Sequence, residues 1–188
     1  MRYKSIYCFV LFVSLLFHQD CFGQNKRIET PKLGVRLTTV YDYWVLHNAV
    51  NLNISLKNHN LYIGPELVHI LMLPKKYDEV DNYSDRSTGL NFGYRYLSRE
   101  FVPKVKFYGQ LNFSIFQLKL CENQIGPPIT QEKISLVVEN TASFGVDYNF
   151  TNKLHLFSGL GFGSYDGFFL MINSFTPTFY VGIQYNWK

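Results

Sequence analysis

The chain has 188 residues and a formal net charge of +4, and its charged fraction of 17% is below the roughly 25% of a typical soluble domain. Aromatic residues make up 18% of the chain, which together with the low charge excludes an intrinsically disordered protein. The chain has no Lys/Arg cluster, which argues against a nucleic-acid-binding protein. Three cysteines are too few for a disulfide scaffold. A mean hydropathy of −0.06 excludes a helical membrane protein but fits a barrel of membrane-spanning strands.

The first 23 residues have the pattern of a secretory signal peptide. A short basic head precedes an apolar run at 5–17, and Cys21 and Gly23 are small residues at the positions three and one before a cut. The apolar run is shorter than the about 20 residues that a transmembrane helix needs. We therefore expect cleavage after Gly23 and a mature chain of residues 24–188. An uncleaved N-terminal anchor and a lipoprotein are the alternatives.

The mature chain alternates apolar and polar residues with a period of two. Residues 49–57 read AVNLNISLK, so a strand would place valine, leucine and isoleucine on one face and asparagine and serine on the other. The same alternation predicts eight strands, at 32–41, 49–57, 61–71, 87–98, 105–116, 137–148, 154–163 and 175–187. Pro65 predicts a bulge in the third strand, because proline cannot donate to a ladder.

The predicted connections alternate in length. Residues 58–60 form a short turn, whereas 72–86, 119–136 and 166–174 are longer and more polar, and 42–48 is intermediate. Each predicted strand has about 9–12 residues, the length that crosses a bilayer at a tilt of about 45°. This pattern is typical of an eight-stranded antiparallel up-and-down transmembrane β-barrel with both termini on the periplasmic side. Such a barrel leaves no unpaired sheet edge in lipid.

Eight strands leave an interior just wide enough for side chains to fill, so we expect a plugged lumen rather than an open pore. The predicted inward faces carry charged side chains that could pair across the interior: Arg36, Glu66, Arg95, Lys106, Glu139, Asp147 and His155. Gly159, Gly161 and Gly163 would make room for arginine, tyrosine and glutamine side chains from across the barrel. Aromatic residues near the strand ends predict two girdles at the membrane–water interfaces.

The chain resembles the small outer-membrane β-barrel proteins of Gram-negative bacteria, the OmpX-like barrels and the transmembrane domain of OmpA. The resemblance rests on the signal peptide, the eight amphipathic strands, the uneven loops and the last strand, FYVGIQYNWK. It implies contact with outer-membrane lipid and lipopolysaccharide. It also implies insertion by the barrel-assembly machinery, which reads an aromatic residue at or near the terminus; here Lys188 follows Trp187.

No sequence motif for hydrolytic, nucleotide or metal chemistry is present, so we expect no catalysis, no cofactor and no metal. One alternative is a lipid A-modifying enzyme with a rim site, in which His47 lies at the outer end of the second strand and Asp85 and Ser87 at that of the fourth. A serine nucleophile needs such a nearby base. Another alternative is a secreted lipocalin-like carrier, which would keep its apolar residues inside the barrel.

The expected role is structural or one of surface interaction, by a monomeric barrel. An extracellular partner could bind through loops 72–86 and 119–136. Lys75 and Lys76 of the first loop could bind lipopolysaccharide phosphates, although a solvated loop is the simpler interpretation.

Overall fold

The computed structural model describes residues 30–42, 44–72, 82–123, 130–165 and 176–187. The expected signal peptide, Lys75 and Lys76, and most of the predicted loops 72–86 and 166–174 lie outside these residues. No helix in the described part of the chain has the length and apolarity to cross a membrane.

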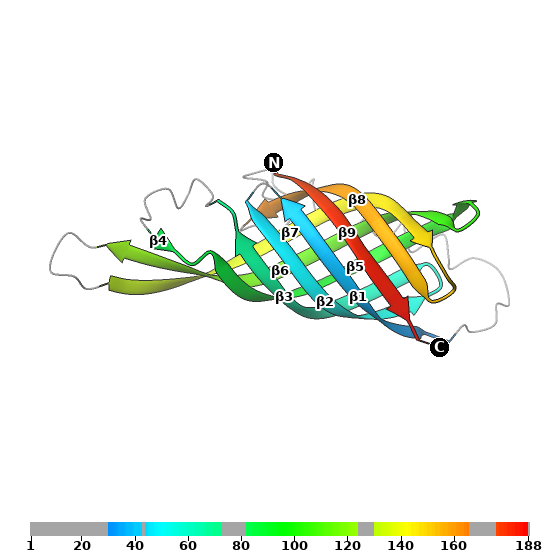
Figure 1. Cartoon of the computed structure of the whole chain (residues 1–188), viewed down its shortest axis with the longest axis horizontal. Helices are drawn as coiled ribbons and strands as arrows, with labels where there is room; N and C mark the ends of the chain where they lie inside the picture. The colour runs from blue at the N-terminus through cyan, green and yellow to red at the C-terminus, as the bar shows by residue number, and fades with distance from the viewer. Residues whose placement is uncertain (1–29, 43, 73–81, 124–129, 166–175, 188) are drawn as a thin grey trace, which may run out of the picture.

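The described residues form eight long strands and one short one. These are β1 (Lys32–Asp42), β2 (Val45–Leu56), β3 (His59–Ile70), β4 (Asn82–Tyr83), β5 (Arg86–Val102), β6 (Val105–Asn123), β7 (Thr130–Asn149), β8 (Leu154–Tyr165) and β9 (Thr176–Asn186). The long strands pair antiparallel in chain order, and β9 pairs back onto β1 to close the barrel (Figure 1). The predicted eight-stranded up-and-down barrel is confirmed.

Short turns join the strands at the end of the barrel where the described chain begins and ends. Lys57 and Lys104 lie in two of these turns and have φ angles of 51° and 70°. Residues other than glycine rarely adopt this left-handed backbone conformation outside tight turns. The Thr151 hydroxyl accepts hydrogen bonds from the backbone N–H groups of Lys153 and Leu154, which holds the turn before β8. We call this the turn end and the opposite one the loop end.

The predicted connection at 42–48 is wrong, because β2 already begins at Val45. Asp42 Oδ1 accepts hydrogen bonds from the backbone N–H groups of Trp44 and Val45, at 2.7 and 2.8 Å. An aspartate that bonds its own downstream backbone makes a tight turn possible. His47 therefore lies within the barrel wall.

The predicted bulge at Pro65 is also wrong. Pro65 pairs with Leu90 of β5 in register, and the β2–β3 register is the same on both sides of the proline. The missing N–H of proline does not shift the strand register, because the β2–β3 ladder has no residue pair at Pro65 itself. The irregularity of the sheet lies in the β5–β6 pairing instead, between Leu97 and Val102.

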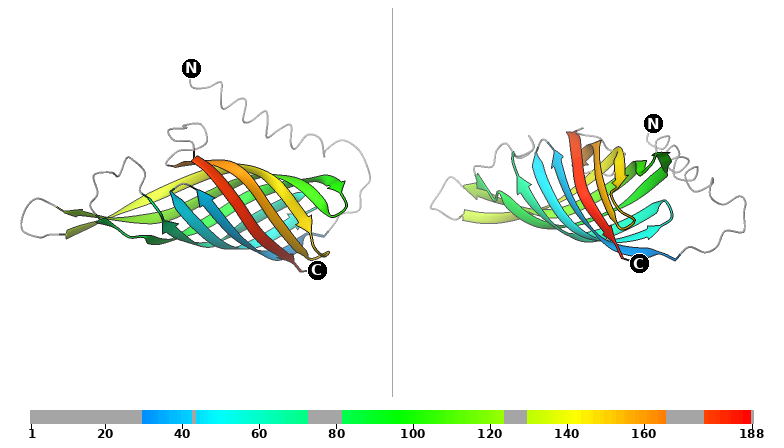
Figure 2. Two further views of the ribbon diagram at one scale, coloured as in Figure 1. Left: turned by 45° about the horizontal axis from the view of Figure 1, so that its top comes forward. Right: turned by 45° about the vertical axis from the view of Figure 1, so that its right-hand side comes forward.

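The predicted loop at 119–136 is largely a β-hairpin. Strands β6 and β7 stay paired from Gln117–Leu136 to Asn123–Thr130, past the last pair that β5 makes with β6. The two-residue strand β4 pairs with this segment of β6. We call the paired residues 117–123 and 130–136 the β6–β7 extension, which projects beyond the other strands in Figure 1 and in both views of Figure 2.

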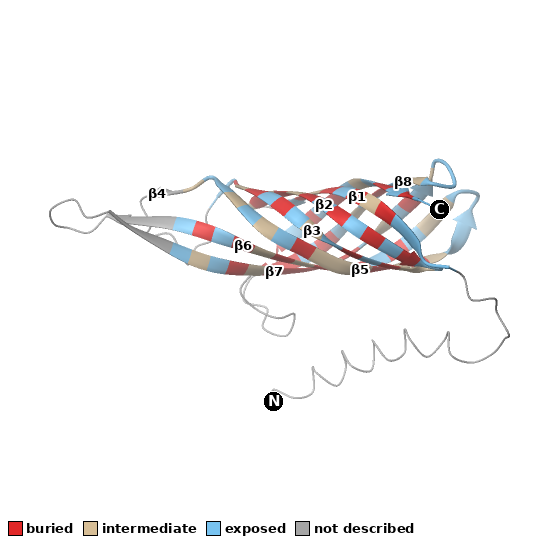
Figure 3. Cartoon of the chain, turned by 90° about the horizontal axis from the view of Figure 1, so that it is seen from below, coloured by how far each residue is buried: buried red, intermediate tan, exposed pale blue. Residues whose placement is uncertain are grey.

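The barrel is apolar outside and polar inside, as the alternation predicts. Buried and exposed residues alternate along the strands in Figure 3. On β2, for example, Leu52 is 62% exposed whereas its neighbours Asn51 and Asn53 are buried. The largest fully buried side chains include Arg36, Arg95, Tyr180, Glu66 and Glu139. This is the reverse of the arrangement that a lipocalin-like carrier of an apolar ligand would need.

Candidate functional site: the barrel lumen

The lumen contains two polar clusters at different depths. The arginine cluster lies toward the turn end and contains Arg36, Arg95, Gln110 and Asp147, with the rings of Tyr62, Tyr108 and Phe157. The carboxylate cluster lies toward the loop end and contains Asp42, His47, Glu66, Ser114 and Glu139. Both draw residues from opposite walls, so they exist only in the closed barrel.

Gln110 joins the two guanidinium groups of the arginine cluster. Its Oε1 atom accepts hydrogen bonds from Arg36 Nη2 at 2.7 Å and from Arg95 Nε and Nη2 at 2.9 and 2.8 Å. Arg95 Nη1 lies 3.4 Å from Asp147 Oδ2, and His155 Nδ1 lies 3.2 Å from Asp147 Oδ1. One carboxylate therefore faces two arginines.

Aromatic rings stabilise the charge that Asp147 does not balance. Phe157 lies between the guanidinium groups, with Arg36 Cζ at 4.4 Å and Arg95 Cζ at 3.8 Å from the ring centroid. Arg36 also lies 4.1 Å from the Tyr62 ring and Arg95 4.1 Å from the Tyr108 ring. Cation–π attraction of this kind is strongest where the cation is desolvated.

Glycines on the inner wall make room for these rings. A Cβ at Gly93 would collide with the Tyr62 side chain, one at Gly159 with Tyr108 and one at Gly182 with Phe157. Of the three glycines singled out in the sequence, Gly159 thus accommodates a tyrosine. Gly161 and Gly163 lie instead against Ser143 and Thr141 of the neighbouring strand.

His47 is the centre of the carboxylate cluster. Its Nε2 atom lies 2.7 Å from Glu139 Oε2 on β7, and its Nδ1 atom lies 3.4 Å from Glu66 Oε2 on β3. The Ser114 hydroxyl of β6 donates to Glu66 Oε1. Asp42 completes the group, because its carboxylate lies close to both His47 and Glu139.

An apolar layer separates this cluster from the loop end. It consists of Val45, Val68, Ile70, Phe116, Leu118 and Val137. The Phe116 ring contacts the His47 imidazole edge to face, with centroids 5.7 Å apart. The carboxylate cluster is thus enclosed by protein.

The residues predicted to form a lumen network all lie on the inner face. Arg36, Glu66, Arg95, Glu139 and Asp147 are buried there. Lys106 and His155 are half-buried near the turn end. The sequence does not indicate how they divide, with two arginines in one cluster and Glu66 and Glu139 in the other.

The structure does not assemble the alternative rim site. His47 pairs in register with Val68, which in turn pairs with Ser87. The histidine and the serine are therefore two strands apart, a total of roughly 10 Å. The Ser87 hydroxyl donates to the backbone carbonyl of Gln117, and Asp85 is exposed.

Asp42 is the residue of the carboxylate cluster that the sequence analysis missed. One ligand atom each from Asp42, His47 and Glu139 lie within 4.8 Å of one another. In the described part of the chain, this is the group whose composition and spacing could hold a metal ion. They come from β1, β2 and β7, so no local spacing motif could reveal them.

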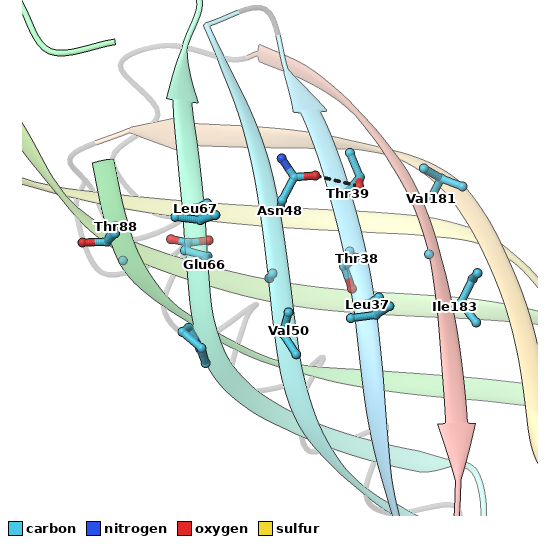
Figure 4. Close-up of a pocket in the computed structure, with 14 residues that line it drawn as sticks. Leu37, Thr38, Thr39, Asn48, Val50, Glu66, Leu67, Thr88, Val181 and Ile183 are labelled. Atoms are coloured by element: carbon cyan, nitrogen blue, oxygen red, sulfur yellow. Dashed lines mark hydrogen bonds between the residues drawn. The ribbon is translucent and has the colours of Figure 1, made fainter. Parts of the chain in front are cut away.

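The outer wall carries a shallow groove of about 660 Å³ across β9, β1, β2, β3 and β5 (Figure 4). Leu37, Val50, Leu67, Val181 and Ile183 line it. The Thr39 hydroxyl donates to Asn48 Oδ1 at 3.0 Å, as the dashed line in Figure 4 shows, so these outward polar groups satisfy each other. The groove is therefore a feature of the apolar exterior.

No protein-family model matches the sequence, and no curated protein matches it. Solved structures with a similar fold include a major outer membrane protein from Thermus thermophilus, at 12% identity and a TM-score of 0.53, covering 85% of this chain and 100% of that one. The N-terminal β-barrel domain of Pseudomonas aeruginosa OprF has 11% identity and a TM-score of 0.51, over 83% and 97%. Neisserial surface protein A has 8% identity and a TM-score of 0.50, over 84% and 96%. Identities this low show a shared fold, and the resemblance to small outer-membrane barrels is confirmed at that level.

Proposed function

We propose that the protein is an integral outer-membrane β-barrel with a plugged lumen, a structural or surface-interaction role and no catalytic activity. The observation that carries the proposal is the inverted wall, with leucine, isoleucine and valine outside and charged residues inside. A bilayer selects for this arrangement, because lipid requires an apolar exterior and a closed ladder that pairs every backbone group.

Aromatic residues at the two ends of the wall support a membrane position. Tyr148, Tyr185 and Trp187 are exposed near the turn end, and Tyr41 is exposed near the loop end. Tyrosine and tryptophan prefer the membrane–water interface, where the ring is apolar and the polar tip is wet. With cleavage after Gly23, the turn end would face the periplasm and the loop end the outside of the cell.

The filled cross-section supports a structural role over conduction. Arg36 and Arg95 are both 0% exposed, and both donate hydrogen bonds to Gln110 inside the barrel. Planar-bilayer recordings of the purified protein should therefore show no steady single-channel conductance.

The surface-interaction role rests on the β6–β7 extension and on β4, which pairs with it. The extension is held by a continuous ladder rather than by a loose loop, and β4 pairs onto it. A rigid projection at the outer surface could contact lipopolysaccharide or an extracellular partner. We expect a monomer that reaches the membrane through the barrel-assembly machinery.

Membrane fractionation, followed by gel migration with and without boiling, tests the proposal. The protein should enter the outer-membrane fraction, need detergent for extraction and migrate differently before and after heating. Leu52→Arg on the outer wall should lower the free energy of unfolding in lipid by about 2–4 kcal/mol. A protein that is soluble without detergent and shows no heat-dependent shift would contradict the proposal.

A further inference from the structure

Among the described residues, the carboxylate cluster combines three buried carboxyl groups with one imidazole. Asp42 is 0% exposed, and His47, Glu66 and Glu139 are each 2% exposed. Even with His47 protonated, its one imidazolium is shared between the carboxylates of Glu66 and Glu139. Buried charges are stable only when they are paired or bind a metal, so a further cation is the simplest way to balance this group.

Oxygen atoms without a hydrogen-bond partner also support a bound cation in this cluster. Glu139 Oε1 has no hydrogen-bond partner in the described part of the chain, although the side chain is almost fully buried. The same holds for the hydroxyl of Thr178, which is 3% exposed and pairs with Asp42 across the β1–β9 ladder. Buried polar atoms are rarely left without a partner, and these belong to residues in or next to the cluster.

The donor atoms of three side chains lie close enough together to converge on one metal ion. One atom each from Asp42, His47 and Glu139 lie within 4.8 Å of one another. Ligands at about 2.0–2.2 Å from a tetrahedral zinc ion lie about 3.3–3.6 Å apart, so binding would draw the most separated donor atoms together by up to about 1.5 Å. One imidazole and two carboxylates suit Zn²⁺ or Mn²⁺ better than Ca²⁺ or Mg²⁺, which prefer oxygen ligands alone.

We propose that Asp42, His47 and Glu139 bind one divalent transition-metal ion inside the barrel. Strands β2 and β7 lie on opposite walls of the ring, so the ion would tie the two walls together. The apolar layer of Val68, Phe116 and its neighbours closes the site from the loop end. A closed site of protein ligands serves a structural role rather than a catalytic one.

Metal analysis of the untagged, folded protein tests this proposal. The chain is refolded in detergent after chelation, equilibrated separately with Zn²⁺, Mn²⁺ or Ca²⁺, and freed of unbound ion by gel filtration. Atomic emission should find about one Zn²⁺ or Mn²⁺ per chain and only background Ca²⁺. The temperature at which the folded gel band disappears should rise with the bound ion. A folded protein that retains neither Zn²⁺ nor Mn²⁺ would overturn the proposal.

Carboxylate-to-amide variants on one strand provide a matched control. Glu139→Gln should lower metal retention by at least about tenfold, whereas Asp147→Asn on the same strand should retain the ion, because it lies in the arginine cluster. Both are compared only in the heat-shifted, folded fraction. If Glu139→Gln does not fold, Co²⁺ in the wild-type chain gives a second readout. Its visible absorption should show nitrogen and oxygen ligands and vanish when Zn²⁺ is added, and a spectrum equal to that of free Co²⁺ counts against the site.

Discussion

The two ends of the lumen carry opposite charge and accommodate it by different means. In the arginine cluster, two guanidinium groups share one carboxylate, and the rings of Tyr62, Tyr108 and Phe157 cover them. In the carboxylate cluster, three carboxyl groups surround one imidazole, and its aromatic neighbour Phe116 contacts the histidine.

The physical reason for the difference is the charge distribution of an aromatic ring. The face of the ring is negative, so it attracts a buried cation and offers nothing to a buried carboxylate. Phenylalanine and tyrosine can therefore stabilise a surplus of arginine without any counter-ion. A surplus of glutamate and aspartate needs bound protons or a cation, which is why a metal site is inferred at only one end.

The largest effect on the free energy of unfolding is expected at Asp147, whose charge is paired with one arginine, Arg95. Arg95→Met removes the guanidinium that faces Asp147 and Gln110, and should lower the free energy of unfolding by about 3–5 kcal/mol, since Asp147 is left buried beside a half-buried histidine. Urea unfolding in phospholipid vesicles, followed by the fluorescence of the two tryptophans, measures this. Adding Asp147→Asn should recover a large part of the loss, and a loss below about 1 kcal/mol would show that the ion pair is unimportant.

A smaller loss is expected at the ring between the arginines. Phe157→Leu keeps an apolar side chain but removes two cation–π contacts, and should cost about 2–3 kcal/mol in the same urea titration. Phe144→Leu on the outer wall, where Phe144 is 62% exposed, is the control and should cost well under about 1 kcal/mol. Equal losses for both variants would mean that the contacts of Phe157 with the two arginines add no stability.

The smallest change is expected from Glu66→Gln, measured with chelator present. The amide can still accept the hydrogen bond from Ser114 while one of three carboxylates is removed, so stability should stay unchanged or rise by up to about 1 kcal/mol. Asp147→Asn, the same change in the arginine cluster, should instead lower stability by about 1–3 kcal/mol. If both variants destabilise the barrel alike, the two clusters do not differ in their charge balance.

The sequence predicts the wall well because the pleat of a strand imposes a period of two. Asn51 and Leu52 must face opposite sides in any strand that contains both, and the structure places Leu52 outside and Asn51 inside. Strand ends are harder to predict. In the proposed membrane location both faces of the β6–β7 hairpin would meet water, so its sequence resembles a loop, as at Lys119, although the residues belong to β6 and β7.

The contacts in the lumen could not be predicted in the same way. Arg36 and Gln110 are 74 residues apart, and their hydrogen bond depends on the stagger of all the strands between them, which alternation does not determine. The local pattern predicts a connection at 42–48, because nothing in it shows that the Asp42 carboxylate closes a turn of two residues before β2 begins at Val45.

The length of the β6–β7 extension determines how far the barrel would project above the membrane surface. From Gln117–Leu136 to Asn123–Thr130 the ladder has seven residue pairs, or roughly 20 Å along the hairpin and about 14 Å along the membrane normal at a tilt of 45°. The headgroup layer on each side of a bilayer is about 5–8 Å thick. In the proposed membrane location, the end of the ladder would therefore stand clear of the lipid surface even with its first residue pairs submerged. A large molecule approaching the cell would meet this edge before it met the other described strands.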